Sequence, residues 1–280
     1  MARIAVVTDS TATIHRETLQ QYGIHVAPLH ITWERSQYRD GIDITAADFY
    51  KKLRVARELP KTSGAIIGEF LQIFESLKGK VDGVAVIVLS KDLSAVHNSA
   101  MNAREMVPDM NIEVIDSRWA TMAMGFGVVA AAKTAFAGGT MEQVIKSATD
   151  IFTKVHLLFI VDTLDYLRRG GRVTLPAAMI GNFLQVKPIL TLKNGKAEPV
   201  GKPLTKPRAV DMLLDMMKKN ITGSPLHVDV MHADDLEAAE QLKSTIASRF
   251  ECKELLLTDF TPVMGAHTGP NCLGVAFYNE

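Results

Sequence analysis

The sequence predicts an α/β protein of two domains, with an N-terminal parallel α/β layer followed by a C-terminal α/β sandwich on a mixed sheet. In the first half, apolar runs of strand length alternate with helical patterns across short connections, which favours a parallel sheet. In the second half, two extended runs flank Asn194-Gly195, a pair that favours an antiparallel hairpin. A chain of 280 residues is also long enough for two cores. We expect one domain over residues 1–150 and another over residues 151–280.

The elements of the first domain follow from the apolar pattern. Strands are expected where the apolar run is short, at residues 3–8, 25–31, 83–89 and 112–116. Helices are expected up to residue 21, around residues 48–53, from residue 66, over residues 94–106 and through the apolar run at 120–132. A helix therefore follows most of the strands, as a parallel sheet requires.

The second domain has a different order of elements. Strands are expected at residues 155–163, in two runs within 187–202, at 226–232, at 254–260 and at 273–278. Helices are expected at residues 164–169, 176–184, 207–219 and 236–250. The hairpin within 187–202 implies antiparallel pairing in this sheet, which makes it mixed.

The composition excludes several classes of function. Basic and acidic residues both number 31, so no net charge directs the chain to nucleic acid or to an anionic membrane. Cys252 and Cys272 have neither a metal-binding spacing nor the density of a disulfide scaffold, and we expect reduced thiols and no metal. The apolar run near the first residues is too short for a signal peptide, and the longest other apolar run, residues 120–132, is too short to span a bilayer, so we expect a cytoplasmic protein without stable membrane insertion.

Sequence motifs for cofactors and for nucleophilic catalysis are also lacking. Residues 125–130, GFGVVA, match a dinucleotide-binding pattern, but they lie inside a helical run rather than at a strand-to-helix turn. There is no P-loop, no zinc-ligand spacing and no nucleophile elbow. Ser94 and His267 could pair in a hydrolase, but the sequence supplies no clear orienting acid. We expect no cofactor.

Hydroxyl side chains gather where expected strands lead into helices. The segment TDST, residues 8–11, ends the first strand, Thr62 and Ser63 lie in an expected loop, and Ser94 stands at an expected helix start. A hydroxyl with the free N–H groups of a helix N-terminus can bind a carboxylate or a phosphate. Each of these residues could also be a helix cap without a ligand.

A histidine with small neighbours precedes the last expected strand. His267 and Thr268 lie between Gly265-Ala266 and Gly269-Pro270. Glycine lets the backbone approach another group closely, so the His267 ring either packs against backbone or faces a ligand.

Three arginines surround a pair of glycines at the end of a short expected helix: Arg168, Arg169 and Arg172. Cations complement the C-terminal end of a helix dipole, and Gly170 can act as a left-handed cap, so a structural role explains the cluster. Guanidinium groups at this density also suit an acidic or phosphorylated partner.

Taken together, the motifs TDST, KTS, LSxxLS, VIDS, VDTLDYLRRGGRV, KPIL and GAHTGP with LGVAFY resemble the DegV family of bacterial fatty-acid-binding proteins. They occur in order from residue 8 to residue 278, so the resemblance covers nearly the whole chain. The sequence departs from the family's usual pattern in places, since KTSQPSP becomes KTSGAII, LSGTY becomes LSAVH and GPGALG becomes GPNCLG. Loop shape and chain-length preference are the properties that these changes affect.

The resemblance implies a DegV-like fold that encloses one long-chain fatty acid between its two domains. It implies that Thr62, Ser94 and His267 bind the carboxylate, with Ser63 and Thr268 beside them. It further implies a non-catalytic role, in which the protein presents the acid to a fatty acid kinase subunit that makes an acyl phosphate for phospholipid synthesis. Arg169 and Arg172 are the residues that the resemblance implicates in docking on that kinase.

One alternative from another class stays open. The related dihydroxyacetone kinase fold suggests an enzyme or carrier for a small phosphorylated or keto compound, with His267 as a covalent or acid–base residue. That reading predicts a short polar pocket, whereas a lipid carrier needs a long apolar one.

Overall fold

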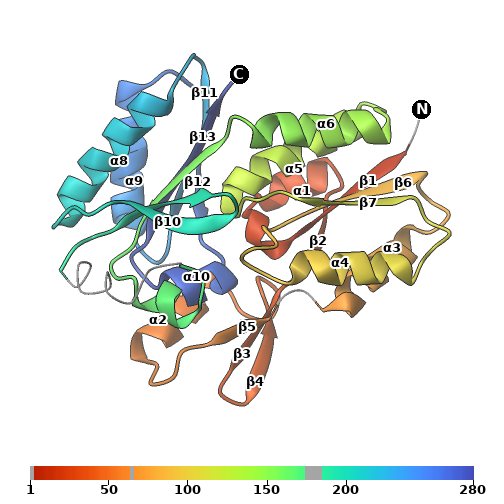
Figure 1. Ribbon diagram of the computed structural model, residues 1–280, viewed down its shortest axis with the longest axis horizontal. Coiled ribbons are helices and arrows are strands. Elements are labelled where there is room, and N and C mark those ends of the chain that lie inside the picture. The colour runs from red at the N-terminus through yellow and green to blue at the C-terminus, as the bar shows by residue number, and fades with distance from the viewer. Residues whose placement is uncertain (1–2, 64–65, 174–184) are drawn as a thin grey trace. The chain divides into compact units, whose positions relative to one another are not determined.

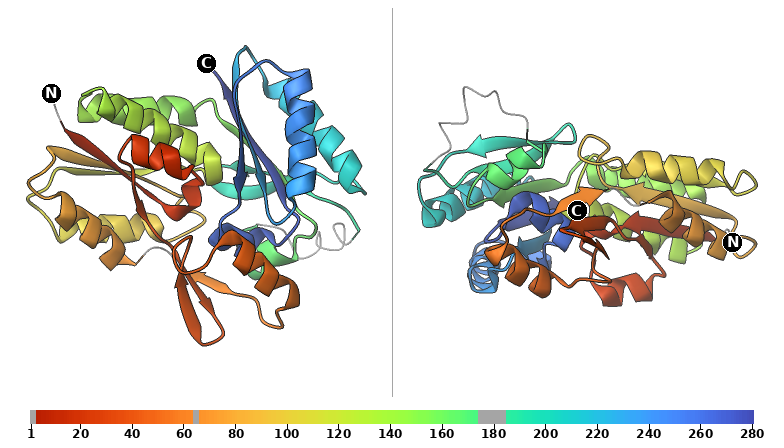
Figure 2. Two further views of the ribbon diagram at one scale, coloured as in Figure 1. Left: turned by 180° about the vertical axis from the view of Figure 1, so that it is seen from behind. Right: turned by 90° about the horizontal axis from the view of Figure 1, so that it is seen from below.

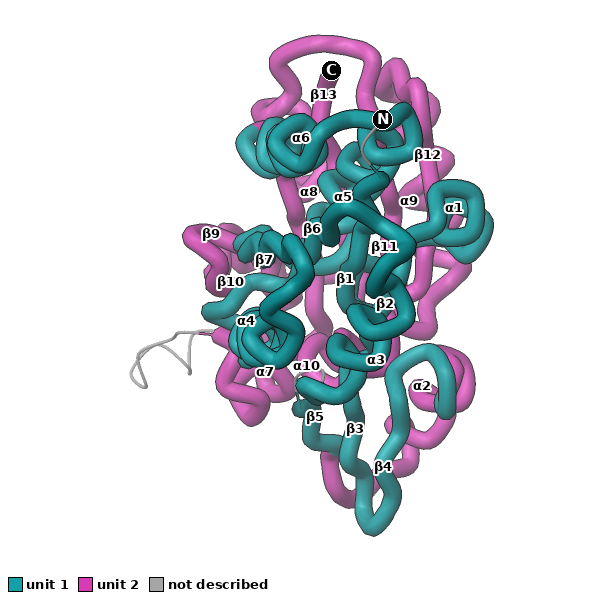
Figure 3. Tube along the Cα trace, turned by 90° about the vertical axis from the view of Figure 1, so that its right-hand side faces the viewer, with its two compact units in different colours: residues 1–44, 60–153 teal, residues 45–59, 154–280 magenta. Residues whose placement is uncertain are grey.

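The computed structural model describes residues 3–63, 66–173 and 185–280 (Figure 1). The chain forms two compact units, which Figure 3 colours separately. Unit 1 comprises residues 1–44 and 60–153, and unit 2 comprises residues 45–59 and 154–280. The sequence predicts a single boundary at residue 150, whereas residues 45–59 belong to the second unit in the structure.

Unit 1 is built on a four-stranded parallel sheet with the strand order β2-β1-β6-β7. Its strands are β1 (Ile4–Asp9), β2 (His25–Ala27), β6 (Gly83–Val88) and β7 (Ile112–Asp116). Every residue of β6 is buried, as expected for a central strand of a parallel sheet that is covered on both faces.

Helices lie on both faces of this sheet (Figure 1). One face is covered by α1 (Arg16–Gln21), α5 (Thr121–Phe136) and α6 (Met141–Phe152), and the other by α3 (Ile67–Leu77) and α4 (Val96–Glu105). A short 3₁₀ helix, η1 (Ser10–Ala12), follows β1. The α6 helix begins with a capping box between Thr140 and Gln143.

A second, small antiparallel sheet in unit 1 corrects two expectations. Its order is β4-β3-β5, with β3 (His30–Trp33), β4 (Ser36–Arg39) and β5 (Lys61–Ser63). The run 25–31 was expected to be one strand, but Pro28 lacks an N–H and separates β2 from β3. The expected loop at Thr62 and Ser63 is a strand that pairs with β3.

Unit 2 is built on a six-stranded mixed sheet with the order β10-β9-β8-β13-β11-β12. Its strands are β8 (His156–Ile160), β9 (Ile189–Lys193), β10 (Lys196–Gly201), β11 (Leu226–His232), β12 (Cys252–Asp259) and β13 (Leu273–Asn279). Within the described part of this six-stranded sheet, β11 and β12 pair in parallel and the other neighbouring strands pair antiparallel. The predicted hairpin is confirmed, because Asn194 and Gly195 join β9 to β10 with φ angles of 50° and 81°.

Two long helices, α8 (Lys206–Asn220) and α9 (Leu236–Arg249), cover one face of this sheet (Figure 2). The remaining helices of unit 2 are α2 (Ala46–Val55), α7 (Asp165–Arg169) and α10 (Pro262–Thr268). The α10 helix packs against both α2 and α7. The helix expected at residues 176–184 lies outside the described residues.

The α2 segment joins unit 2 because its anchoring side chains contact that unit. Phe49 and Tyr50 are buried, and the Tyr50 hydroxyl donates to the carbonyl of Phe260 at 3.0 Å. Arg54 forms an ion pair with Asp234, with 2.6 Å between Nε and Oδ2. A helix of ten residues shows in its sequence that one face is apolar, but not which core buries that face.

The predicted fold class is confirmed as α/β with one parallel and one mixed sheet. Within the described part of the chain, none of the helices combines the length and the apolar character needed to cross a membrane.

Candidate functional site

Ser94 lies in the loop that follows β6, two residues before α4 rather than at its first residue. Its Oγ accepts from the N–H of Val96 at 3.3 Å, so it satisfies one of the free donors of the helix N-terminus. The loop contains a turn in which the Ser90 carbonyl accepts from the N–H groups of Leu93 and Ser94, at 3.0 and 3.1 Å. Ser94 is half-buried, and these hydrogen bonds hold its backbone in place.

Asp9, which the sequence placed in the TDST segment, ties two loops of the same sheet edge together. Its Oδ2 accepts from Leu89 N at 2.7 Å, and its Oδ1 accepts from Thr11 N at 2.9 Å. Burial raises the pKa of this carboxyl, while its hydrogen bonds act in the opposite direction. Asp9 therefore fixes the start of the loop that carries Ser94 and caps η1.

Thr62 and Ser63 lie on β5, where Thr62 pairs with Ile31 and Ser63 pairs with His30. Thr62 is half-buried and Ser63 is exposed. Nothing in the sequence pattern indicates His30 as a candidate. In the structure its Nε2 lies 2.9 Å from Glu69 Oε1 of α3. This His–Glu pair connects the small sheet to α3 within unit 1.

His267 lies in the last turn of α10, a helix that the sequence pattern does not predict. The helix forms because Pro262 takes one of its first positions, where a missing N–H costs nothing, and Gly269 ends it with a φ of 74°. Gly265 in its middle admits the Tyr50 ring, because a Cβ there would lie 2.5 Å from the Tyr50 hydroxyl. The small residues around His267 thus serve helix packing.

Gly170 provides the space for the His267 ring. A Cβ at residue 170 would lie 2.4 Å from His267 Nδ1, closer than side-chain atoms can come. Gly170 itself has a φ of −73°, so the left-handed cap expected there is instead Gly171, with a φ of 71°. The glycine pair was recognised in the sequence, but its two separate tasks could not be assigned without the fold.

The electrostatics of His267 suit an anionic ligand. Burial, with a further contribution from the positive charge of Arg172, lowers the pKa of His267 to about 4. The imidazole is therefore neutral near pH 7, with one N–H donor and one acceptor nitrogen. Arg172 is half-buried, donates to the carbonyl of Gly170, and has its own pKa lowered by burial.

Thr268 and Arg169 have local partners. Thr268 is buried, and its hydroxyl donates to the carbonyl of Met264 at 3.1 Å within α10. Arg169 is exposed and pairs with Asp165 at 2.8 Å, and Arg168 binds the other oxygen of the same carboxylate. Within unit 2 the structure thus brings His267 and Arg172 together, while Arg169 remains on the surface of α7.

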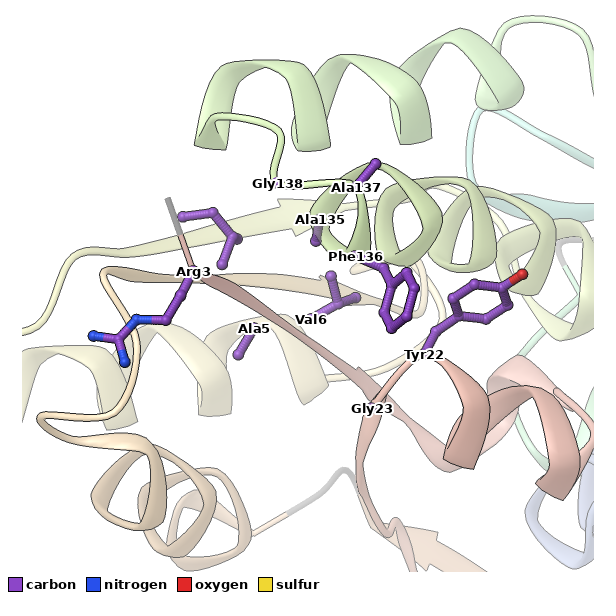
Figure 4. A pocket seen from close by; sticks show the side chains of 10 residues that line it. Arg3, Ala5, Val6, Tyr22, Gly23, Ala135, Phe136, Ala137 and Gly138 are labelled. Carbon is purple, nitrogen blue, oxygen red and sulfur yellow. The ribbon is translucent and has the colours of Figure 1, made fainter. Parts of the chain in front are cut away.

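A groove of about 370 Å³ lies elsewhere in unit 1, at the start of β1 (Figure 4). It is lined by Arg3, Ile4, Ala5, Val6, Tyr22, Gly23, Ala135, Phe136, Ala137 and Gly138. Figure 4 shows the Tyr22 and Phe136 rings at one end and Arg3 at the other. None of the sequence-predicted site residues lines this groove.

The described residues hold no group of three or more His, Cys, Asp or Glu side chains that could ligate a metal ion. The GFGVVA segment lies within α5, so it does not form the strand-to-helix turn of a dinucleotide site. Cys272 is a buried free thiol, and burial strongly raises its pKa.

Comparisons with known proteins agree with this architecture. Residues 3–280 match the model of the uncharacterised proteins of the DegV family. A DegV domain-containing protein of Caldanaerobacter subterraneus is 35% identical over 278 residues, which are 99% of this chain and 99% of that protein.

Two solved structures are also similar over their whole length. A DegV family protein from Thermus thermophilus, described for its fatty acid binding, gives a TM-score of 0.93 at 28% identity, covering 99% of this chain and 100% of that one. Bacillus subtilis DegV, described as a fatty acid binding protein, gives a TM-score of 0.92 at 32% identity, with 100% of both chains covered.

Proposed function

Because this chain belongs to the DegV family, we propose that it binds a long-chain fatty acid and holds the carboxylate with Thr62, Ser94 and His267. Ser63 and Thr268 are the neighbouring residues of the same proposed site. The protein supplies no nucleophile in this proposal and acts in the cytoplasm, as a carrier rather than as an enzyme.

The environment of His267 is the observation that carries the proposal. A neutral imidazole can donate a hydrogen bond to a carboxylate, while Arg172 next to it supplies the positive charge. A buried carboxylate is tolerable only when it is hydrogen-bonded, and this pair offers both a donor and a charge. Because Gly170 has no side chain, the His267 ring fits beside it without steric conflict.

The apolar tail accounts for most of the expected affinity. Burying one methylene contributes about 0.8 kcal/mol, so roughly fifteen methylenes contribute on the order of 12 kcal/mol before the costs of binding. A few hydrogen bonds to the head group add only about 0.5–3 kcal/mol each. The tail therefore sets affinity, and the residues around the carboxylate set orientation.

The proposal includes a kinase subunit that phosphorylates the bound acid. A carboxylate oxygen would attack the γ-phosphorus of ATP held by the kinase, which gives the acyl phosphate and releases ADP. Arg169 is the more suitable docking residue, because its side chain is 60% exposed on α7. Arg172 is half-buried beside His267, so its charge is better placed to act on the head group than on a protein partner.

Native mass spectrometry of protein purified from a bacterial host tests the proposal directly. We expect a fraction of the protein to carry the added mass of an alkyl carboxylic acid, which extraction with organic solvent should remove. A protein that carries no lipid and fails to take up palmitate after extraction, yet binds a small keto or phosphorylated compound, would favour the alternative related to dihydroxyacetone kinase.

His267→Ala then tests the head group separately. We expect the variant to lose affinity for palmitate by about tenfold, the equivalent of one charged hydrogen bond, and to keep its affinity for hexadecanol. Equal losses for both ligands would mean that the ring only packs the helix end.

A further inference from the structure

The α2 helix contacts the chain on both sides of α10, the helix that carries His267. On the N-terminal side, the Tyr50 hydroxyl donates to the carbonyl of Phe260 at 3.0 Å, and Phe260 N donates to His232 O at 2.8 Å. The Tyr50 ring also lies against Gly265 in the middle of α10. The start of α10 is thereby fixed to α2 and to the end of β11.

On the C-terminal side, Asn271 receives contacts from several elements of unit 2. Its Oδ1 accepts from Arg54 Nη2 at 3.0 Å, and its Nδ2 donates to Asp162 Oδ2 at 2.8 Å. Its backbone N–H donates to Ala233 O at 2.6 Å, and its carbonyl accepts from Lys206 Nζ at 3.2 Å. The side-chain oxygen and nitrogen of Asn271 and its backbone N–H and carbonyl are therefore all hydrogen-bonded, in the short loop between α10 and β13.

The partners of Asn271 are themselves fixed. Arg54 is held by Asp234 through Nε, and its Nη2 donates to the Asp234 carbonyl at 3.3 Å. Asp162 pairs with Lys187 at 2.8 Å, and Lys206 pairs with Asp235. Asn271 has a φ of 61°, a left-handed conformation that asparagine tolerates better than most residues.

Tyr50 and Arg54 lie four residues apart, on one face of α2. One face of a single helix therefore contacts the chain before α10 through Tyr50 and after it through Arg54. His267 lies between these two fixed points, with its ring against Gly170.

We propose that α2 is a clamp for α10, in which Arg54 and Asn271 are positioning residues that keep the His267 ring against Gly170. The proposal rests on the proposed function for its consequence in ligand binding, but the position of the ring can be measured without a ligand. In the described part of the chain, the hydrogen bonds of Arg54 and Asn271 go to each other and to Asp234, Asp162, Lys206 and Ala233. Both residues therefore act through the C-terminal end of α10.

The expected consequence of a loosened clamp is a change in the surroundings of His267. Its pKa is lowered by burial and by the positive charge of Arg172, and both influences weaken if the ring moves toward solvent. The pKa of His267 would then rise from about 4 toward the ordinary value of 6.5.

The first experiment follows the His267 ring by NMR titration in delipidated full-length protein. Arg54→Gln removes the charge and Asn271→Gly removes the side chain but keeps the left-handed backbone accessible. We expect the pKa of His267 to rise by at least about half a unit in each variant. The His267→Ala spectrum assigns the resonance.

Matched controls separate positioning from general effects. Arg57→Gln removes an exposed cation just after α2, for which the described residues provide no ion-pair or hydrogen-bond partner. Asn194→Gly makes the same change at another left-handed asparagine, with a φ of 50°, in the β9–β10 turn. Neither control should move the His267 titration.

The second experiment measures palmitate and hexadecanol binding by the same variants. We expect Arg54→Gln and Asn271→Gly to weaken palmitate binding roughly threefold to tenfold and to leave hexadecanol binding unchanged, with melting temperatures within a few degrees of wild type. An unchanged His267 titration in both folded variants overturns the clamp. If the titration shifts but His267→Ala binds palmitate normally, the clamp stands and the proposed head-group site fails.

Discussion

Gly170 and Gly171 are adjacent, but they meet different requirements. Gly171 needs the left-handed backbone, with a φ of 71°, and has open space around its Cα. Gly170 has an ordinary φ of −73°, and the limit on it is the His267 ring. The first requirement is conformational and the second is steric, so substitutions at the two positions should affect different properties.

Gly170→Ala should reduce palmitate binding with little change in backbone strain. The added methyl would lie 2.4 Å from His267 Nδ1, so the ring must leave its place. Gly171→Ala should instead destabilise the fold by about 1–2 kcal/mol and leave the affinity intact. Thermal melts together with palmitate titrations measure both effects, and loss of affinity only in Gly171→Ala would contradict the assignment.

Ser94→Ala should weaken retention of palmitate without unfolding the protein. The substitution removes a proposed donor to the carboxylate and the bond to Val96 N, a cap worth about 1 kcal/mol. Retention is measured by mass spectrometry after dilution, and stability by thermal melting. A variant that melts earlier but retains palmitate as wild type does would reduce Ser94 to a helix cap.

At the scale of elements, the buried strands and long helices could be predicted from their apolar patterns. The strands β6, β7 and β11 and the helices α8 and α9 lie within a residue or two of the expected ranges. The polar, mostly exposed strand β4 has no such pattern, and β5 has only three residues. The pairing of β5 with β3 joins residues about thirty positions apart, which composition does not encode, whereas β4 follows β3 directly through a turn at Glu34 and Arg35 that lacks an Asn-Gly or Asp-Gly pair.

The α10 helix was missed for a related reason. Its seven residues include a glycine and a proline, which in a sequence usually indicate a loop. Contacts with α2 and α7 compensate for the weak intrinsic preference. Thr62, Ser94 and His267 are candidates that the family resemblance indicates from the sequence, whereas the space at Gly170 and the contacts of Arg54 and Asn271 required the fold.

The α7 helix gives the prediction for the kinase partner. Arg169→Ala should leave palmitate bound but slow acyl phosphate formation with a cognate kinase. Arg169 is exposed on α7 and is not one of the residues proposed to hold the carboxylate. Asp165 would keep Arg168 as a partner in the variant, so α7 should remain folded. Full turnover by Arg169→Ala would leave only a helix-dipole role for this side chain.

At the scale of the whole molecule, the chain passes from unit 1 to unit 2 and back through residues 45–59 before the main crossing near residue 153. Each unit has its own core cluster, one beneath α5 and α6 and the other beneath α8 and α9. A sequence shows two alternations of strands and helices, but not a short excursion between them. Tyr50, which donates to the Phe260 carbonyl, and Arg54, which pairs with Asp234, are the residues that connect this excursion to unit 2.

The pH dependence of stability should report on unit 2 through Asp229 in the middle of β11. Its Oδ2 accepts from Thr258 at 2.8 Å, and its Oδ1 has no hydrogen-bond partner in the described part of the chain. Burial raises the pKa of this carboxyl from 3.8 to about 8. The folded state therefore binds a proton that the unfolded chain releases between about pH 4 and pH 8.

The sign of the effect follows from this difference. Across that window the free energy of unfolding should fall as the pH rises, by up to about 1.4 kcal/mol per pH unit from this group. Asp229→Asn keeps an acceptor for Thr258 and removes the titration, so its stability should depend less on pH and exceed that of wild type at pH 8. Urea unfolding of delipidated protein at pH 5 and pH 8 measures this, with Asp211→Asn on the exposed side of α8 as the charge-matched control. The same pH dependence in wild type and Asp229→Asn would show that Asp229 is ionised in the fold, and that water or a rearranged side chain reaches it.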